Sequence, residues 1–379
     1  MRPIRIALLT EIPAPYRLPL FNELAAAPDV ELNVLFLAAA DPKRPYTLHA
    51  SEMRFPHRIL RGASIVRGGR WLVLNRGVKR QLQTFRPDVV IVGGWNQPAF
   101  WLARRYARRH NVPLVVWVES TARDQRSGSG PLERAKRSMI SSCAAFVVPG
   151  RASREYLSTL GVASAQITVA PNAVDLSVFR DAVGAIRADR AAVRSERGLT
   201  RTTVLYVGRL DPEKGVDVLI DAMRNADADL VVVGDGSQSA ALRQTAPANV
   251  RFTGWLDRDQ LVPWFAAADV FALPSRSEQW GMVLNEAAAA GLPLVASAAA
   301  GASWELIDDG VSGTRFEPGD PEVLWAALQP YLADAELREA AGRASAAQAA
   351  GHTATAWAAA VTALASTLVS PDEASKSHS

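Results

Sequence analysis

The chain has 379 residues, 49% of them hydrophobic, and a formal net charge of +4. This length suits two ordinary domains, because one domain usually takes about 100–200 residues. The single cysteine, Cys143, excludes an internal disulfide framework and fits a reducing cytoplasm. Proline, glycine or charge interrupts every apolar run before it reaches transmembrane length, so we expect no membrane span.

Charge is distributed unevenly along the chain. Residues 1–185 hold 26 Lys and Arg against 13 Asp and Glu, whereas residues 186–379 hold 16 against 25. A basic half can face anionic lipid, a phosphorylated acceptor or nucleic acid, and it can equally be an arginine-coated surface. The same two interpretations apply to the arginine-rich helix expected at 98–110. We expect a cytoplasmic protein without a nucleic-acid partner, with possible contact between the basic half and the anionic inner face of the plasma membrane.

The first half alternates apolar runs with helical spacing. Strands are expected at 5–9, 30–37, 89–92, 114–118, 144–148 and 167–170, and helices at 16–27 and 98–110. Near-continuous apolar strands between helices indicate a parallel sheet that is covered on both faces. Ligands of such sheets bind beyond the carboxyl ends of the strands, which draws attention to the loops 11–17, 93–97 and 119–123. The segment 123–131 is polar and predicted to be mobile, and 171–175 is predicted to form a turn.

A second alternating series follows a charged, helical stretch at 176–200, where we place the linker. Its strands are expected at 203–207, 230–233, 250–253, 270–273 and 294–296, and alanine-rich helix follows Pro321. Two α/β halves of similar size fit this pattern better than one large sheet. The predicted domains are 1–185 and 186–355, followed by a helix at 356–370 and a disordered polar tail at 371–379.

The segment 274–286 is the most informative part of the second half. A Pro/Ser turn follows the strand at 270–273, and after Gly281 the sequence becomes helix-forming. Glu278 is therefore expected in the loop and Glu286 on the helix. The backbone N–H groups near Gly281, Met282 and Val283 would be the unpaired donors of a helix N-terminus, which is a site suited to an anion.

A second loop can supply cations to the same anion. Gly208, which permits close backbone approach, follows the strand at 203–207, and Arg209 and Lys214 come shortly after it. Together the two side chains are predicted to clamp a diphosphate, although an isolated pair of this kind is usually just solvated.

Several motifs in this order resemble the retaining family-four glycosyltransferases of the GT-B fold. They are Val207-Gly208-Arg209 with Lys214-Gly215, Gly234-Asp235-Gly236, Phe252-Thr253-Gly254, Glu278 followed eight residues later by Glu286, and Pro171-Asn172 with Val174-Asp175 and Phe179 in the first half. The resemblance implies two Rossmann-like domains facing across a cleft, with the acceptor on the first and the donor on the second. It also implies that the C-terminal helix packs back on the first domain.

The resemblance implies roles for individual residues. Arg209 and Lys214 would bind the donor diphosphate, Glu286 the ribose hydroxyls, and Glu278 the donor sugar near its reacting carbon. Gly208 would let the backbone approach the donor, Gly281 would bind the donor at the helix start, and Met282, Val283 and Leu284 would present N–H groups to phosphate or sugar. Glu278, Arg209 and Lys214 are thus the expected catalytic residues. The implied reaction is hexosyl transfer from a UDP- or GDP-linked sugar to a hydroxyl of a glycan, lipid-linked or small-molecule acceptor in polysaccharide or glycoconjugate biosynthesis, by front-face displacement with no metal or cofactor.

The first half departs from the family pattern at the acceptor side. A histidine often follows the corresponding strand in the family, whereas Glu119 follows the strand at 114–118 here. Glu119 either replaces that histidine or simply pairs with Arg123. Trp95 is either a platform for a sugar ring or a buried core side chain. The acceptor candidates are Tyr16, Arg17, Trp95, Asn96, Glu119 and Arg123.

Other functions fit less well. A nucleotide-sugar epimerase of similar fold would need acid/base residues that the sequence does not offer at suitable spacing, and a silent sugar-nucleotide binder would not need all four charged donor residues. A dinucleotide oxidoreductase is disfavoured because Gly234-Asp235-Gly236 lacks the third glycine of that fingerprint.

Overall fold

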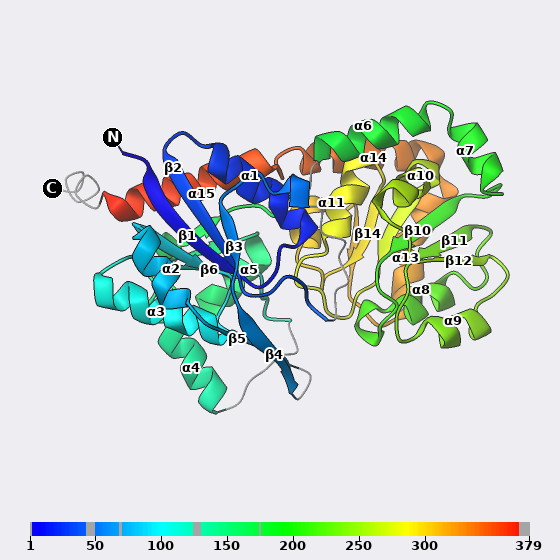
Figure 1. Ribbon diagram of the computed structural model, residues 1–379. Coiled ribbons are helices and arrows are strands. Elements are labelled where there is room, and N and C mark those ends of the chain that lie inside the picture. Colours follow the sequence, from blue (N-terminus) through cyan, green and yellow to red (C-terminus); the bar gives the residue numbers. More distant parts are fainter. Residues whose placement is uncertain (1, 43–49, 68–69, 124–129, 174–175, 371–379) are drawn as a thin grey trace.

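The computed structural model describes residues 2–42, 50–67, 70–123, 130–173 and 176–370. Within them the chain forms two α/β domains that lie side by side, each built on a parallel sheet (Figure 1). This arrangement confirms the expected fold class. The loop residues 124–129, the turn residues 174–175 and the tail 371–379, for which mobility, a turn and disorder were predicted, lie outside the described residues.

The N-terminal sheet has the strand order β3-β2-β1-β6-β7-β8-β9, and all its neighbouring strands are parallel. Six of its strands were expected from their apolar runs. The seventh, β3, was missed because it is a three-residue, exposed edge strand. The strands are β1 (Ile4–Thr10), β2 (Val30–Phe36), β3 (His57–Ile59), β6 (Val89–Val92), β7 (Leu114–Trp117), β8 (Ala145–Val148) and β9 (Ile167–Val169).

Helices cover both faces of this sheet, as its apolar strands require. Along β1, Ile6 and Leu8 point to one face and Ala7 and Leu9 to the other, and each pair joins a separate core cluster. The helices α1 (Leu18–Ala26) and α15 (Ala354–Val369) cover the first face. The second face carries α2 (Val78–Phe85), α3 (Pro98–His110), α4 (Pro131–Ile140) and α5 (Arg151–Thr159).

An antiparallel hairpin also belongs to this domain. It consists of β4 (Gly62–Arg67) and β5 (Arg70–Asn75), and β5 packs against α3. No hairpin was expected here, because Gly62–Arg67 shows no regular alternation of apolar and polar residues.

The C-terminal sheet has the strand order β12-β11-β10-β13-β14-β15 and is also fully parallel. Only β15 was not expected. The strands are β10 (Thr203–Val207), β11 (Asp229–Val233), β12 (Val250–Gly254), β13 (Val270–Leu273), β14 (Leu294–Ser297) and β15 (Gly313–Phe316). The helices are α8 (Val216–Ala222), α9 (Ser239–Thr245), α10 (Arg258–Ala267), α11 (Met282–Ala289), α12 (Ser303–Leu306), α13 (Pro321–Ala333) and α14 (Ala335–Ala349).

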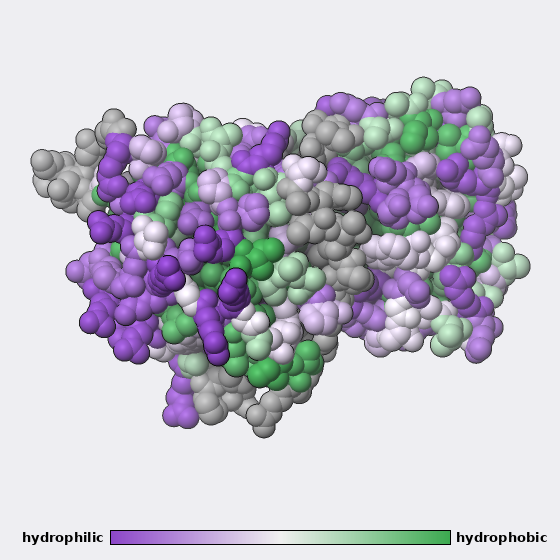
Figure 2. All heavy atoms as spheres, viewed as in Figure 1, coloured by the Kyte–Doolittle hydropathy of each residue, from purple (hydrophilic) through white to green (hydrophobic). Residues whose placement is uncertain are grey.

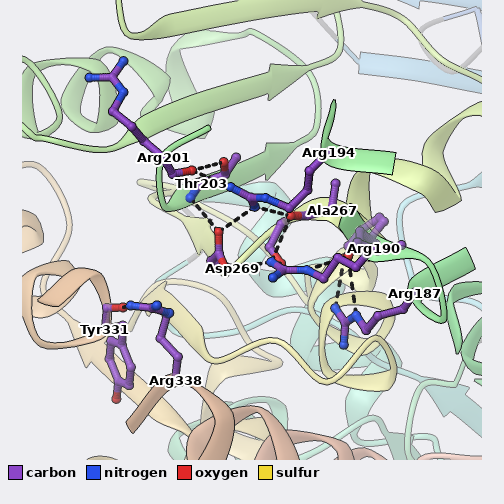
Figure 3. A network of polar contacts seen from close by, with 12 residues as sticks. Arg187, Arg190, Arg194, Arg201, Thr203, Ala267, Asp269, Tyr331 and Arg338 are labelled. Atoms are coloured by element: carbon purple, nitrogen blue, oxygen red, sulfur yellow. Dashed lines mark hydrogen bonds and ion pairs between the residues drawn. The ribbon is translucent and has the colours of Figure 1, made fainter. Parts of the chain in front are cut away.

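The expected linker is helical, but it packs on the second domain. It forms α6 (Leu176–Arg187) and α7 (Arg190–Glu196), so the boundary predicted at residue 185 falls inside α6. Arg187, Arg190 and Arg194 donate hydrogen bonds to main-chain carbonyls at the end of α10, and the last two also pair with Asp269 (Figure 3). Arginine at the carbonyl end of a helix satisfies its unpaired acceptors and complements its dipole. The change of domain therefore comes before α6.

The chain returns to the first domain through α15. Trp357 on this helix is buried, with its ring centroid 5.1 Å from that of Trp117 and 6.1 Å from that of Phe21. The return of the C-terminal helix to the first domain is thereby confirmed, and in Figure 1 α15 lies alongside α1.

Candidate functional site

The two sequence-predicted donor loops pack directly on one another at the carboxyl end of the C-terminal sheet. The loop after β10 includes a short 3-10 helix, η4 (Pro212–Lys214), and the carbonyl of Glu213 accepts the N–H groups of Arg276 and Ser277 from the loop after β13. Gly215 has φ of 66°, and a Cβ there would lie 2.3 Å from the carbonyl oxygen of Pro274. Only glycine fits at this crossing, which fixes how the two loops meet.

Lys214 and Glu278 form an ion pair between these loops. The Lys214 ammonium donates to Oε2 of Glu278, and the side chains are only 13% and 20% exposed. The strand order places β10 beside β13, which brings together residues that are 64 positions apart. A partly buried ammonium with its carboxylate partner is a preorganised charge of the kind that stabilises a leaving phosphate.

Arg209 lies beside this pair and is held by two acidic side chains. Its guanidinium donates to Asp211 and, at 3.0 Å, to Glu213. Burial raises the pKa of Asp211, but hydrogen bonds from Ser237, together with Arg209 and Lys214, hold it below its usual value overall. The Arg209 side chain is 48% exposed, so it can exchange these partners for an incoming anion.

Helix α11 begins at Met282, directly after Gly281 with its φ of 92°. The Leu284 N–H already donates to the Gly281 carbonyl at 2.8 Å. Within the described residues, no backbone acceptor pairs with the N–H groups of Met282 and Val283. The donors expected for an anion are thus present at those two positions, and the expectation for Leu284 is corrected because its N–H is already used within the first turn.

Glu286 lies on α11 in surroundings that disfavour its charge. Burial raises the pKa of its carboxyl to about 7, and the charge of Arg258 only partly offsets this effect. No hydrogen bond to the Glu286 side chain occurs within the described residues. Because no described residue hydrogen-bonds to it, this carboxyl group is available to a ligand hydroxyl.

Arg17 and Glu119 are brought together in the first domain, at the carboxyl ends of β1 and β7. The guanidinium donates to Oε2 of Glu119 at 2.9 Å and to the Thr10 hydroxyl at 2.8 Å, and it lies 4.5 Å from the Trp117 ring centroid. Burial lowers the pKa of Arg17, but Glu119 and other nearby groups raise it well above its usual value overall. Pairing of Glu119 with Arg123 was one sequence interpretation, and the structure shows Arg17 as its partner instead.

A buried chain of hydrogen bonds connects Glu119 to the second domain. Asn172 donates to Oε1 of Glu119 at 3.2 Å, and its carbonyl accepts from Asn285 on α11 at 3.3 Å. Asn285 in turn accepts from the Trp280 indole at 2.9 Å. Asn172 and Asn285 are fully buried. The acceptor candidates are thereby joined to the helix that follows Glu278.

The remaining acceptor candidates have different environments. Tyr16 lies next to Arg17, whose guanidinium is 5.7 Å from the Tyr16 ring centroid. Trp95 is half-buried and packs on the core cluster under α3, so it has part of the character of a core side chain. Asn96 is exposed and donates to Glu11 at 2.7 Å. Arg123 reaches across to the second domain and pairs with both carboxylate oxygens of Glu317, at 2.9 and 3.0 Å.

Sequence reasoning did not select Glu11, Gln97 or Asn172 as site side chains. Glu11 follows β1 and accepts hydrogen bonds from both Asn96 and Gln97. Each of the three lies in or next to a loop that was already considered. The sequence signal that could have identified them was therefore the position of that loop at the end of a strand. Their partners come from distant parts of the chain, and local spacing does not reveal such partners.

The described residues contain neither a membrane-spanning helix nor a metal-binding cluster. No helix among them is long and apolar enough to cross a membrane. No group of three or more His, Cys, Asp or Glu side chains there has the arrangement of a metal site.

Comparison with known proteins identifies the class of enzyme to which this chain belongs. A family model described as Glycosyltransferase Family 4 matches residues 22–178, and one described as Glycosyl transferases group 1 matches residues 189–348. The glycogen synthase of Mycobacterium tuberculosis strain H37Rv is 31% identical over 334 residues, covering 84% of this chain and 76% of that protein. A D-inositol 3-phosphate glycosyltransferase of Xylanimonas cellulosilytica is 33% identical over 285 residues, covering 68% and 67%.

Solved structures agree on the fold. Anabaena Alr3699/HepE, determined in complex with UDP and glucose, superposes with a TM-score of 0.73 at 21% identity, covering 96% of this chain and 100% of that one. The sucrose-phosphate synthase of Thermosynechococcus elongatus gives 0.72 at 20% identity, covering 96% and 99%. The fold and the charged loops therefore define a glycosyltransferase of the GT-B type. This chain belongs to the family-four glycosyltransferases.

Proposed function

We propose that the enzyme is a retaining hexosyltransferase that uses a UDP- or GDP-linked sugar. The Lys214–Glu278 ion pair is the observation that carries the proposal, because it brings the two donor loops into contact beside Arg209. In this proposal, the two cations and the helix start at Met282 act on one diphosphate.

In the proposed complex, Arg209 exchanges Asp211 and Glu213 for phosphate oxygens. The N–H groups of Met282 and Val283 donate to the same diphosphate or to the sugar. Glu286 accepts from the ribose hydroxyls, and Glu278 accepts from a hydroxyl of the donor sugar. The Lys214 ammonium holds the Glu278 carboxylate in place while it faces the phosphate.

The proposed reaction is a front-face displacement. The bond from the anomeric carbon to the diphosphate oxygen breaks, and the acceptor oxygen bonds to that carbon on the same face. The acceptor proton passes to the leaving phosphate oxygen. Arg209, Lys214 and the helix start stabilise the negative charge that develops there, an effect in which one preorganised donor is typically worth about 10²–10³ in rate.

The acceptor is proposed to bind on the first domain, near Arg17 and Glu119. Glu119 has one oxygen held by Arg17 and the other by Asn172, so its position is fixed before the acceptor arrives. A fixed carboxylate can accept a hydrogen bond from a hydroxyl of a glycan, a lipid-linked sugar or a small polyol.

Thermal stabilisation by UDP, GDP and ADP, and then by their sugars, tests the donor assignment. A ligand at about 100 times its Kd should add about 2.7 kcal/mol to the free energy of unfolding. Lys214→Ala should remove this stabilisation. Lys136→Ala is the matched control, since Lys136 is also ion-paired and is 16% exposed. Equal stabilisation of wild type and Lys214→Ala would contradict the donor site.

Incubation with the donor alone separates transfer from epimerisation, which is the alternative function. An epimerase turns over a nucleotide-sugar without an acceptor, whereas the proposed transferase should give at most slow hydrolysis. Accumulation of an epimeric nucleotide-sugar would overturn the assignment.

A further inference from the structure

The β4–β5 hairpin exposes an apolar face. Ser64 and Val73 face one way, and Val73 is buried and Trp71 half-buried against the core under α3. The opposite face carries the register pairs Ala63 with Leu74 and Ile65 with Leu72. The described side chains of this face are apolar, Ile65 and Leu74 are each 48% exposed, and the register pair Arg67 with Arg70 continues the same face towards the turn. Figure 2 shows apolar spheres gathered at the lower middle of the molecule, where Figure 1 draws β4 and β5.

This apolar face lies within a strongly basic segment. Between Glu52 and Asp88 the chain contains nine arginine and lysine residues and no acidic one. The exposed ones among the described side chains are Arg54, Arg58, Arg61, Arg76, Lys79, Arg80 and Arg86. Helix α2, which follows the hairpin directly, carries two of them and packs against α3.

The apolar face and the surrounding positive charge together indicate which kind of surface the hairpin binds. Edge ribbons in water are usually protected by charged side chains on the exposed face, whereas the described side chains of this face are apolar and arginine stands only next to the turn, at Arg67 and Arg70. A second copy of the chain would bring the same positive charge against the first, so repulsion opposes self-association through this face. An anionic lipid surface satisfies both features, because its headgroups attract the cations and its acyl boundary accepts the apolar side chains.

We propose that the β4–β5 hairpin docks the enzyme on an anionic lipid bilayer. The outward side chains Ile65, Leu72 and Leu74 enter the interface, and the surrounding arginine and lysine side chains contact the phosphate headgroups. This contact does not require the donor or acceptor assignments to be correct.

The hairpin is tied to the acceptor side of the site by one buried side chain. Gln97 accepts the Val73 N–H at 3.0 Å and donates to the Trp71 carbonyl at 3.0 Å and to Glu11 at 2.9 Å. Glu11 lies at the carboxyl end of β1, next to the loop that carries Arg17. Docking of the hairpin therefore places the acceptor candidates close to the lipid surface. On the proposed function, this location favours an acceptor that is anchored in the bilayer.

Co-sedimentation with vesicles tests the docking. The wild type should bind vesicles that contain phosphatidylglycerol and should not bind pure phosphatidylcholine, and added salt should weaken the binding. Ile65→Ser/Leu74→Ser should weaken it at least tenfold. Val311→Ser/Val323→Ser is the matched control, since these apolar side chains of the second domain are 53% and 41% exposed. Unchanged binding of the hairpin variant, or equal binding to neutral vesicles, would overturn the proposal.

A fluorescent label reports insertion directly. Cys143 is the only cysteine and is buried, and burial raises the pKa of its thiol to about 12, so it should not react. A polarity-sensitive dye on Ile65→Cys should shift to the blue with anionic vesicles, and the same dye on Val311→Cys should not. Unchanged melting temperature and UDP response show that each variant is folded. A missing shift, or a wild-type dimer that the hairpin variant dissociates, would contradict bilayer docking.

Discussion

Lys214 and Glu278 stand 64 residues apart and share an ion pair at the meeting point of two loops. Both loops were selected from the sequence by different signals, a cationic strand end and a helix start. Their contact is a product of strand order, because β10 and β13 are neighbours in the sheet. The ion pair thus joins two loops that were predicted independently from the sequence.

Replacing either partner should stop sugar transfer without unfolding the protein. Lys214→Ala removes a cation from the proposed diphosphate site, and Glu278→Ala removes the proposed sugar ligand. We expect kcat/KM to fall by at least about 10²–10³ in each variant. Their effects in the double variant should be less than additive, because each single change already breaks the pair. Full activity in both purified variants would exclude the assignment.

Arg209 allows a closely matched comparison. Arg209→Ala should raise the Kd for the nucleotide and lower kcat, since its guanidinium is proposed to bind the phosphates. Arg224→Ala changes an arginine of nearly the same exposure, 46% against 48%, that pairs with Asp221 elsewhere on the same domain. Calorimetric titration with UDP and GDP compares them. A similar loss of nucleotide affinity in Arg209→Ala and Arg224→Ala would indicate a general effect of charge on binding.

Glu286 gives a prediction with a defined pH dependence. Its folded pKa of about 7 lies above that of an unfolded glutamate, so folding favours the neutral form. This contribution to stability is complete below about pH 4.5 and is lost as pH rises through about 7. Glu286→Gln should therefore be more stable than the wild type at pH 8, on the order of 1–2 kcal/mol because part of the side chain reaches solvent, and equally stable near pH 4.5.

Urea unfolding at pH 4.5 and pH 8 measures this difference in stability. Nucleotide affinity should have the opposite pH dependence. Ribose hydroxyls donate more strongly to a carboxylate than to a neutral carboxyl, so nucleotide affinity should increase as pH rises through about 7. The increase should be absent in Glu286→Gln. A pH-independent stability difference would show that Glu286 does not titrate in this range.

The sequence predicted the parts of the fold that local patterns specify. Strands β10 and β13 and helix α3 were predicted at their observed bounds, because Gly208 ends the first, Pro274 ends the second and Pro98 begins the third. The hairpin was missed because its stability comes from packing on α3 and from Gln97, both distant in sequence. Glu119 shows the same limit: the nearby Arg123 was considered, whereas its partner Arg17 is 102 residues away.

Removal of Arg17 should separate acceptor binding from donor binding. Arg17→Ala leaves Glu119 without its cation at a site where both side chains are less than 20% exposed. The lost pair should cost on the order of 3 kcal/mol of stability. The acceptor KM should rise while the Kd for the nucleotide stays unchanged, since the donor loops are on the other domain. Arg17→Lys should recover part of the stability, and an unchanged acceptor KM in the alanine variant would place the acceptor elsewhere.

The return of the C-terminal helix depends largely on one side chain. Trp357 is 1% exposed between Trp117 and Phe21, so Trp357→Ala should destabilise the N-terminal domain by about 3–5 kcal/mol. Limited proteolysis should then cut near α15 while nucleotide-induced stabilisation of the second domain persists, because that domain has its own core. Val369→Ala, at an exposed position of the same helix, should leave the melting temperature unchanged within error. Loss of nucleotide binding together with the helix would instead show that the donor domain requires α15 to fold.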